Sequence, residues 1–238
     1  MMRQAFGRKI VRETIERNLL WRALSLLFRD PRAFLHGSYR QLYRLLTDLQ
    51  GDLRLGVWTG LWKPKYHDDA CEFYGYEPVS YSTLRDLRRH MRARNIAVKT
   101  FIDVGCGFAR PLYFFAVEFE ELLGYEITDK IYRASVEQLA RARVKNPDFR
   151  KISLLMQDAT LSLPLDRNLV LFLYNPFGPD PMARLCDRLK ESEHETHIYY
   201  VNPQYANLLE EHLGVRGEQF STFMKVCYFH VPARAAAV

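Results

Sequence analysis

The stretch FIDVGCGFARP (residues 101–111) combines a carboxylate with a run of small residues. An apolar segment reaches Asp103 and is followed by Gly105, Gly107 and Ala109 at alternate positions. Glycine permits positive φ angles and a close approach of the backbone to a ligand, and a small residue at position 109 lets a following helix pack against the strand. The pattern predicts a tight turn on which a ligand lies, beside a carboxylate.

Two ligand classes use such turns. Dinucleotides favour small residues at relative positions 1, 3 and 6, but position 6 is occupied here by Arg110. S-adenosylmethionine favours small residues at positions 1, 3 and 5, which are Gly105, Gly107 and Ala109. Asp103 would repel a diphosphate but accept a hydrogen bond from an ammonium group. The turn therefore favours S-adenosylmethionine, with S-adenosylmethionine's amino-acid moiety near Asp103.

Further acidic residues follow the next two apolar runs. Glu126 lies 21 residues after Gly105 and suits a pair of ribose hydroxyls. Asp158 can accept a hydrogen bond from an adenine amine. Alone, each acid is more often a helix cap or a solvated strand end, but their order along the chain makes the two assignments support one another.

The second part of the chain alternates between short apolar runs and helical patterns, which predicts a parallel sheet covered on both faces. The predicted strands are 98–104, 122–127, 152–157, 169–174 and 197–201, and the predicted helices lie near 109–119, 129–144, 181–191 and 204–213. The last run, FSTFMKVCYFHV, has no intervening helix and predicts an antiparallel edge strand. Because ligands bind beyond the carboxyl ends of parallel strands, the residues after each strand form the candidate site.

The first quarter of the chain differs in charge and pattern. Residues 1–65 carry 13 Lys and Arg against 5 Asp and Glu, whereas residues 66–238 carry 21 against 23. Helical periodicity predicts an amphipathic helix over 8–28 and another over 38–49, so we expect a basic helical extension, residues 1–65, before the main domain, residues 66–238. The extension is expected to pack on the main domain, with an anionic membrane surface contacted through 8–28, or nucleic acid, as the alternatives.

The composition, with 48% hydrophobic and 26% charged residues, is that of a folded protein without a transmembrane segment, which we expect to be cytoplasmic. A further helix is predicted from residue 82 to about 94, with Ser80 or Ser82 as its N-cap. The four cysteines and seven histidines show no metal-ligand spacing. We therefore expect no metal site, and we interpret the histidines as structural or surface residues.

From about residue 76 onward the chain resembles the class I S-adenosylmethionine-dependent methyltransferases. FIDVGCGFA is similar to their first motif, LGYEI to the acidic end of their second strand, MQDAT to their adenine-side acid and LVLFLYNPFG to their fourth motif. The resemblance implies a Rossmann-like α/β fold with a seven-stranded, mostly parallel sheet and an antiparallel last strand. It implies that S-adenosylmethionine is bound by Asp103, Gly105, Cys106, Gly107, Ala109, Glu126 and Asp158.

YEPVSY and YNPFGPD are also similar to elements of the non-SET histone-lysine methyltransferases. That likeness implies that Tyr76, Glu77 and Pro78 cover the cofactor and that Asn175 and Phe177 border the methyl acceptor. Asn-Pro-Phe, with Pro176, also resembles part of the Asn-Pro-Pro-aromatic motif of amino-group methyltransferases. The same segment is compatible with a plain strand-to-loop turn.

The predicted reaction is an in-line methyl transfer in which positioning supplies most of the acceleration. Asn175 would orient an amine of a protein or small molecule, with nucleic acid as the second acceptor class. Tyr81, Glu77 or solvent would take up the proton of the amine. Two other functions stay open at this point: a cofactor-binding scaffold without turnover, and an NAD-dependent oxidoreductase, which Arg110 disfavours.

Overall fold

The computed structural model describes residues 31–60, 77–221 and 223–234. Three predictions lie outside these residues: the helix over 8–28, the domain boundary near residue 65 and the placement of Tyr76. Among the residues that the structure describes, no helix is both long and apolar enough to cross a lipid bilayer.

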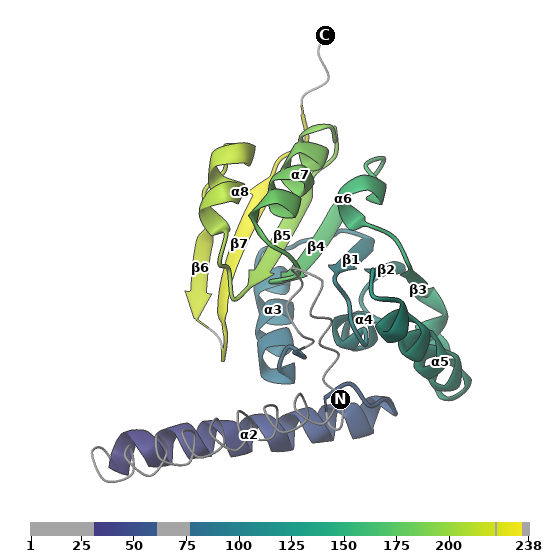
Figure 1. Ribbon diagram of the computed structural model, residues 1–238, viewed down its shortest axis with the longest axis vertical. Coiled ribbons are helices and arrows are strands. Elements are labelled where there is room, and N and C mark those ends of the chain that lie inside the picture. The colour runs from purple at the N-terminus through teal and green to yellow at the C-terminus, as the bar shows by residue number, and fades with distance from the viewer. Residues whose placement is uncertain (1–30, 61–76, 222, 235–238) are drawn as a thin grey trace, which may run out of the picture. The chain divides into compact units, whose positions relative to one another are not determined.

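A seven-stranded sheet in the order β3-β2-β1-β4-β5-β7-β6 forms the centre of the main unit (Figure 1). The strands are β1 (Thr100–Val104), β2 (Glu121–Tyr125), β3 (Ile152–Leu155), β4 (Leu169–Tyr174), β5 (Thr196–Val201), β6 (Glu218–Ser221) and β7 (Lys225–Val231). The first five strands are parallel to one another, and β7 is antiparallel to both of its neighbours. This arrangement confirms the predicted α/β fold with a mostly parallel sheet and an antiparallel last strand.

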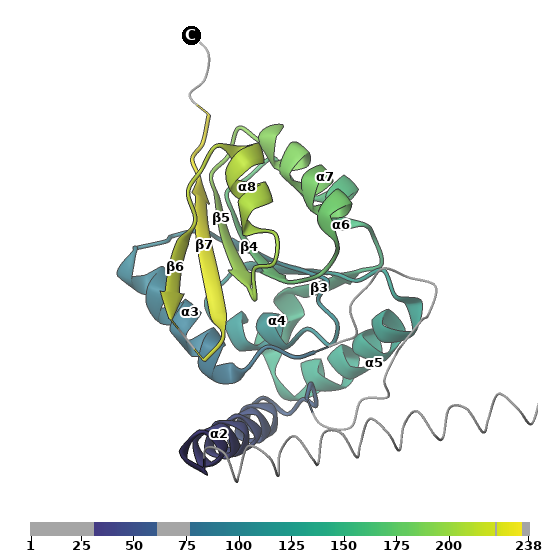
Figure 2. The same cartoon turned by 60° about the vertical axis from the view of Figure 1, so that its left-hand side comes forward.

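Helices cover both faces of the sheet (Figures 1 and 2). On one face lie α3 (Tyr81–Ala93), α4 (Arg110–Phe115) and α5 (Asp129–Lys145), and on the other α6 (Ala159–Ser162), α7 (Pro179–Lys190) and α8 (Ala206–Leu213). A 3-10 turn, η1 (Pro147–Lys151), precedes β3. Because the central strands are buried from both sides, they are apolar along nearly their whole length, which is typical of parallel sheets.

The alternation of side chains along each strand divides the core into two layers. Phe101 and Phe172 belong to the layer under α3, α4 and α5, whereas Ile102 and Leu171 pack under α6 and α7. All four side chains are essentially fully buried, and burial of each contributes roughly 1.5–3 kcal/mol. The two layers hold β1 and β4 rigidly, and the candidate site follows directly from the ends of these strands.

The carboxyl-terminal run differs from the prediction in one respect. We expected a single edge strand, but the run includes the end of β6 as well as β7, and β7 lies between β5 and β6. β7 therefore pairs on both sides, and its centre, Cys227–Phe229, is buried. The short strand β6 takes the edge position, which limits the length of unpaired backbone there.

The first described helix, α2, runs from Pro31 to Leu55 and is longer than the predicted helix over 38–49. The chain divides into two compact units, Met1–Leu46 and Thr47–Val238, so the end of α2 belongs to the unit that contains the sheet.

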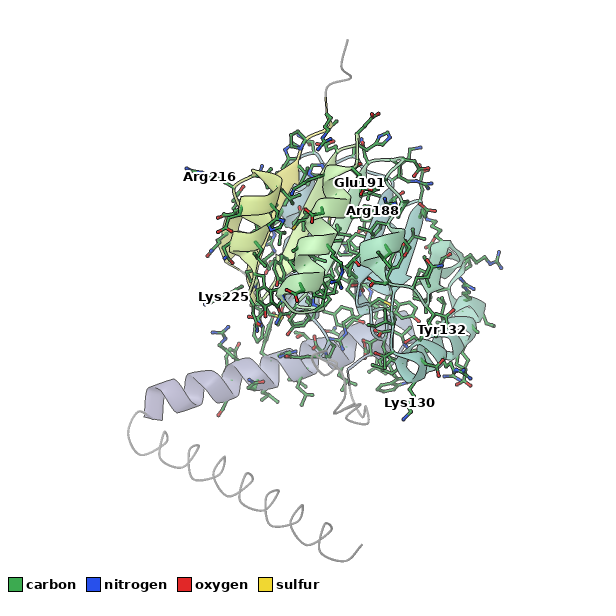
Figure 3. All side chains as sticks on the ribbon, turned by 45° about the horizontal axis from the view of Figure 1, so that its top comes forward. Lys130, Tyr132, Arg188, Glu191, Arg216 and Lys225 are labelled. Carbon is green, nitrogen blue, oxygen red and sulfur yellow. The ribbon has the colours of Figure 1, made fainter. Side chains whose placement is uncertain are left out.

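Charged side chains outside the core face solvent. Figure 3 shows Lys130 on α5 and Arg216 before β6 projecting outward, and both residues are exposed. Arg188 and Glu191, at the end of α7, form an ion pair at the surface. Surface pairs of this kind add little stability, usually below about 1 kcal/mol, so the fold depends chiefly on its two apolar layers.

Candidate active site

The two glycines of the turn after β1 adopt the positive φ angles that glycine permits, and Ala109 adopts one as well. Gly105, Gly107 and Ala109 have φ angles of 70°, 52° and 60°, all in the left-handed region. For alanine this conformation costs roughly 1–2 kcal/mol, so the surrounding structure must hold Ala109 in place. At Gly105 a Cβ atom would lie 2.9 Å from Cβ of Pro176, so only glycine allows the turn after β1 to contact the turn after β4.

Three hydrogen bonds fix the glycine turn. The amide of Cys106 donates to the carbonyl of Tyr125 at 2.9 Å, which joins the turn to the end of β2. The buried hydroxyl of Ser135 on α5 donates to the carbonyl of Gly107 at 2.7 Å. The amide of Gly107 donates to Glu126 Oε2 at 3.1 Å. The turn is therefore preorganised by the strand and helix next to it.

Asp103, near the end of β1, is only 3% exposed. Its Oδ2 atom has no hydrogen-bond partner among the residues that the structure describes. Burial, and then the negative charge of Glu126, raise the pKa of Asp103 well above the usual range of an aspartate. A buried carboxylate oxygen without a partner is costly to a folded protein, and a cation at this position would satisfy it.

Glu126 follows β2 and is 8% exposed. Besides the bond from Gly107, its Oε1 accepts a hydrogen bond from the amide of Thr128 at 2.8 Å. Each carboxylate oxygen has a second lone pair, so Glu126 can accept two more hydrogen bonds on the cavity side. The two backbone donors therefore orient the carboxylate without saturating it.

Asp158 is the N-cap of the short helix α6. Its Oδ1 accepts from the amide and the hydroxyl of Thr160, at 2.9 and 2.8 Å. The capping function accounts for an acidic residue here without any ligand. The residue also lines the cavity described below, so the capping and binding interpretations are compatible.

Asn175 directly follows β4, with a φ angle of 48°, and is 8% exposed. Its Oδ1 accepts a hydrogen bond from the buried hydroxyl of Tyr200 on β5, at 3.1 Å. Asparagine tolerates the left-handed region better than most residues, which explains its place in this turn. Strained residues with a fixed side chain are concentrated at functional sites.

These elements enclose a cavity of about 390 Å³. Ten of the predicted site residues line it: Pro78, Asp103, Gly105, Cys106, Gly107, Glu126, Asp158, Asn175, Pro176 and Phe177. Glu77 lines it too, so four carboxylates border the cavity, together with Arg184 and Arg110. Burial, and then the charges of Asp103 and Glu126, raise the pKa of the Cys106 thiol in this wall well above the usual range.

Two predicted site residues do not line the cavity. Ala109 is fully buried and is the N-cap of α4. Tyr81 is 3% exposed, and its hydroxyl donates to Asp52 Oδ1 at 2.8 Å. Burial, and then the charge of Asp52, raise the pKa of Tyr81 far above its ordinary value. Tyr81 is thus held away from the space where a substrate could lie.

Tyr81 belongs to a largely buried polar network, which we call the Arg110 network. Its members are Asp48, Asp52, Thr59, Tyr81 and Arg110. Arg110 Nη1 lies 2.9 Å from Asp48 Oδ2, and Arg110 Nη2 lies 3.6 Å from Asp52 Oδ2. The Arg110 guanidinium also donates to Thr59 Oγ1 at 2.5 Å and lies 4.7 Å from the centre of the Tyr81 ring. The network ties the end of α2 and the start of α3 to the helix that follows the glycine turn.

The Tyr81 ring packs so closely on Gly51 in α2 that a change to alanine is expected to destabilise the protein. An alanine in a helix is normally more stable than a glycine by about 1 kcal/mol. At Gly51, however, a Cβ atom would lie 2.3 Å from Cδ2 of Tyr81. We expect Gly51→Ala to lower the free energy of unfolding by about 1–3 kcal/mol, measured by urea denaturation.

The control for this prediction is the same change in a Tyr81→Ala background. There the ring is absent, so Gly51→Ala should stabilise the protein. Stabilisation by Gly51→Ala in the wild-type background would contradict the packing described here.

Sequence reasoning missed two residues that line the cavity after β5, Asn202 and Gln204. Asn202 has a φ angle of 51°, close to that of Asn175. The signal was present, because VNP at the end of β5 repeats the YNP at the end of β4. Arg110 was interpreted only as a mismatch to dinucleotide turns, and its role as the centre of a network was not foreseen.

Comparisons with known proteins bear on the fold. No family model matches the chain, and no curated protein matches its sequence. Among solved structures, a proposed RNA methyltransferase from Pyrococcus horikoshii matches with a TM-score of 0.50 and 12% identity, over 80% of this chain and 98% of its own. The chain has the class I S-adenosylmethionine-dependent methyltransferase fold.

Two other methyltransferase structures match this chain with lower TM-scores. A magnesium protoporphyrin IX methyltransferase from Synechocystis, with bound S-adenosylmethionine, has a TM-score of 0.49 and 12% identity over 82% of this chain and 97% of its own. A SAM-dependent methyltransferase from Aquifex aeolicus has a TM-score of 0.45 and 12% identity over 65% of this chain and 100% of its own. The resemblance to the non-SET histone-lysine methyltransferases stays a prediction.

Proposed function

We propose that the chain is an S-adenosylmethionine-dependent methyltransferase that acts on an amine nitrogen of a protein or small molecule. The cofactor is proposed for the cavity at the ends of β1, β2 and β4. The fit is supported by Asp103 Oδ2, which has no hydrogen-bond partner among the described residues, and by the acidic border of the cavity. Both features favour a ligand with positive charge.

Five cavity residues would hold the cofactor in this proposal. Asp103 accepts a hydrogen bond from the ammonium group, Glu126 accepts from the ribose hydroxyls, and Asp158 accepts from the adenine amine. Gly105 and Gly107 let the backbone approach the ligand closely. Bound there, S-adenosylmethionine supplies an electrophilic methyl group on its sulfonium.

The same observations disfavour a dinucleotide. A diphosphate needs cationic or amide donors, but Asp103 and Glu126 stand next to the turn. Arg110, which also borders the cavity, is paired with Asp48 and with Asp52. A pyrophosphate at this turn would therefore meet net negative charge.

The contact between Pro176 and the glycine turn is the observation that carries the acceptor proposal. Because a Cβ at Gly105 would lie only 2.9 Å from Pro176, the Asn175 turn directly adjoins the proposed cofactor site. Asn175 Oδ1 already accepts one bond from Tyr200, and its second lone pair can accept from an amine N–H. Holding the amine there would align it for in-line transfer.

The acceptor amine must lose its proton before or during transfer. Of the two side chains considered for this step, Tyr81 is poorly suited, because its hydroxyl donates to Asp52 and it does not line the cavity. Glu77 is exposed and lines the cavity. We therefore assign proton uptake to Glu77 or to solvent.

The test is incubation of the full chain with S-adenosylmethionine that carries a labelled methyl group. Separate reactions would contain small-molecule amines, a protein mixture and nucleic acid. Label in the N-methyl groups of amines or proteins is the expected result. Label only in nucleic acid would replace the proposed acceptor class, and cofactor binding without any transfer would support a scaffold instead.

A further inference from the structure

A group of metal-ligating side chains lies far from the cavity, on the last strands of the sheet. His197 on β5 and His230 on β7 are direct partners in the antiparallel register. Directly opposed residues of an antiparallel pair project on the same face, so the two imidazoles are neighbours. Glu195, the residue before β5, adds a carboxylate to this pair (Figure 1 shows β5 and β7).

The three side chains lie close enough to share one ion. One ligand atom from each falls within 4.8 Å of the others. Glu195 Oε1 lies 2.7 Å from Nε2 of His230 and 3.2 Å from Nε2 of His197. The two rings are nearly parallel, with centres 4.9 Å apart and an interplanar angle of 8°. Ligands about 2.05 Å from a tetrahedral ion lie about 3.3 Å apart, so small side-chain shifts suffice for coordination.

We propose that Glu195, His197 and His230 bind a zinc ion. Two imidazole nitrogens and one carboxylate oxygen form a ligand set that zinc uses in proteins, with water as the fourth ligand. The side chains of His230 and Glu195 are 46% and 33% exposed, so an ion and its water can enter from solvent.

The surroundings of His197 suit it as a ligand. Its side chain is only 8% exposed, so neighbouring residues surround its ring. Its Nδ1 lies 2.7 Å from the hydroxyl oxygen of Tyr228. When Nδ1 donates to that oxygen, the lone pair of Nε2 is available to the ion, and the ring orientation is fixed.

Two features oppose the ion and limit its affinity. Without metal, the two imidazole N–H groups can both donate to Glu195, so the ion must replace hydrogen bonds that already satisfy the group. The guanidinium of Arg94 lies 4.9 Å from the centre of the Tyr228 ring and adds positive charge nearby. Arg94 forms an ion pair with Glu218, which offsets part of this charge.

The position of the group indicates a structural role. The cavity lies at the carboxyl ends of the parallel strands, whereas Glu195 and His197 lie at the amino end of β5. An ion there would join β5 to β7, where the sheet changes from parallel to antiparallel. We therefore expect zinc to stabilise the fold without taking part in methyl transfer.

The experiment is a titration of the full, metal-stripped chain with Zn²⁺ against a chromophoric chelator, together with thermal unfolding. The wild-type protein should bind one zinc ion per chain through Glu195, His197 and His230, and its Tm should rise with zinc. His230→Gln and Glu195→Gln should weaken that binding by more than about 100-fold and abolish the Tm shift. Tyr228→Phe, which removes only the outer hydrogen bond, should weaken it by about 10- to 100-fold.

His212→Gln is the matched control, because His212 also lies near a carboxylate, 3.5 Å from Asp187, but has no third ligand among the described residues. It should leave zinc binding unchanged. Co²⁺ substitution should give a tetrahedral absorption spectrum without a thiolate charge-transfer band. Two results would overturn the proposal. One is the absence of stoichiometric zinc binding, and the other is binding that survives both His230→Gln and Glu195→Gln, which would place the ion at another site.

Discussion

Replacing Asp103 by asparagine is expected to weaken S-adenosylmethionine binding by about 10- to 100-fold, the usual worth of a hydrogen bond to a charged group. The same change should stabilise the free protein at neutral pH. Asp103 is buried and its Oδ2 has no partner among the described residues, and an amide is less costly to bury than a carboxylate. Calorimetric titration measures the affinity for S-adenosylmethionine, and urea denaturation measures the stability, each for the wild-type protein and for Asp103→Asn.

The stability difference between Asp103→Asn and the wild-type protein should depend on pH, and the direction follows from the pKa of Asp103. Burial and Glu126 raise the pKa of Asp103 in the folded state, so folding strengthens proton binding at this carboxyl group. The associated stability is present below the usual pKa of an aspartate and is lost as the pH rises through the raised pKa. The stability advantage of Asp103→Asn should therefore grow with increasing pH across this window. An advantage that shrinks with pH, or unchanged cofactor affinity, would contradict the assigned role.

Removing the side chain of Asn175 is expected to lower kcat by about 100- to 1,000-fold, the typical effect of losing one oriented group in an active site. Cofactor affinity should change little, because Asn175 is assigned to the acceptor. The comparison uses Asn175→Ala and Asn175→Gly, measured with the amine acceptor identified by labelling. Glycine accepts the φ angle of 48° without strain, so loss of activity in both variants would separate chemistry from backbone strain.

Tyr200→Phe is the companion variant. It removes the hydroxyl that donates to Asn175 Oδ1 but keeps the buried ring. We expect a smaller reduction in kcat, about 10-fold, because the amide is still present but less firmly oriented. Full activity in Asn175→Gly would show that the carboxamide does not hold the acceptor.

Local patterns were sufficient to predict the sheet and the glycine turn. The apolar runs around Phe101 and Leu171 marked strands because both faces of the sheet are covered, and β4 has the predicted bounds. Gly105 and Gly107 were predicted to permit positive φ angles in a tight turn, and both adopt them. Ser80 caps α3, one of the two residues predicted for that position.

Features that depend on distant pairings were not predictable in the same way. Arg110 is separated by 62 residues from Asp48, and nothing in the local pattern links them. His197 and His230 show no metal-ligand spacing in the sequence, since it is the register of β5 and β7 that makes them neighbours. Tyr81 was predicted as one of the groups that could take up the amine proton, but the first turn of α3 directs its hydroxyl to Asp52.

The central claim is that the cavity binds S-adenosylmethionine through its acidic residues. Calorimetric titration of the full chain with S-adenosylmethionine, and with reduced nicotinamide dinucleotide for comparison, tests it most directly. We predict one site per chain for S-adenosylmethionine, strongly weakened in Glu126→Ala, and no binding of the dinucleotide. A folded wild-type protein that binds no S-adenosylmethionine, or binds it equally well without the Glu126 carboxylate, would contradict the account.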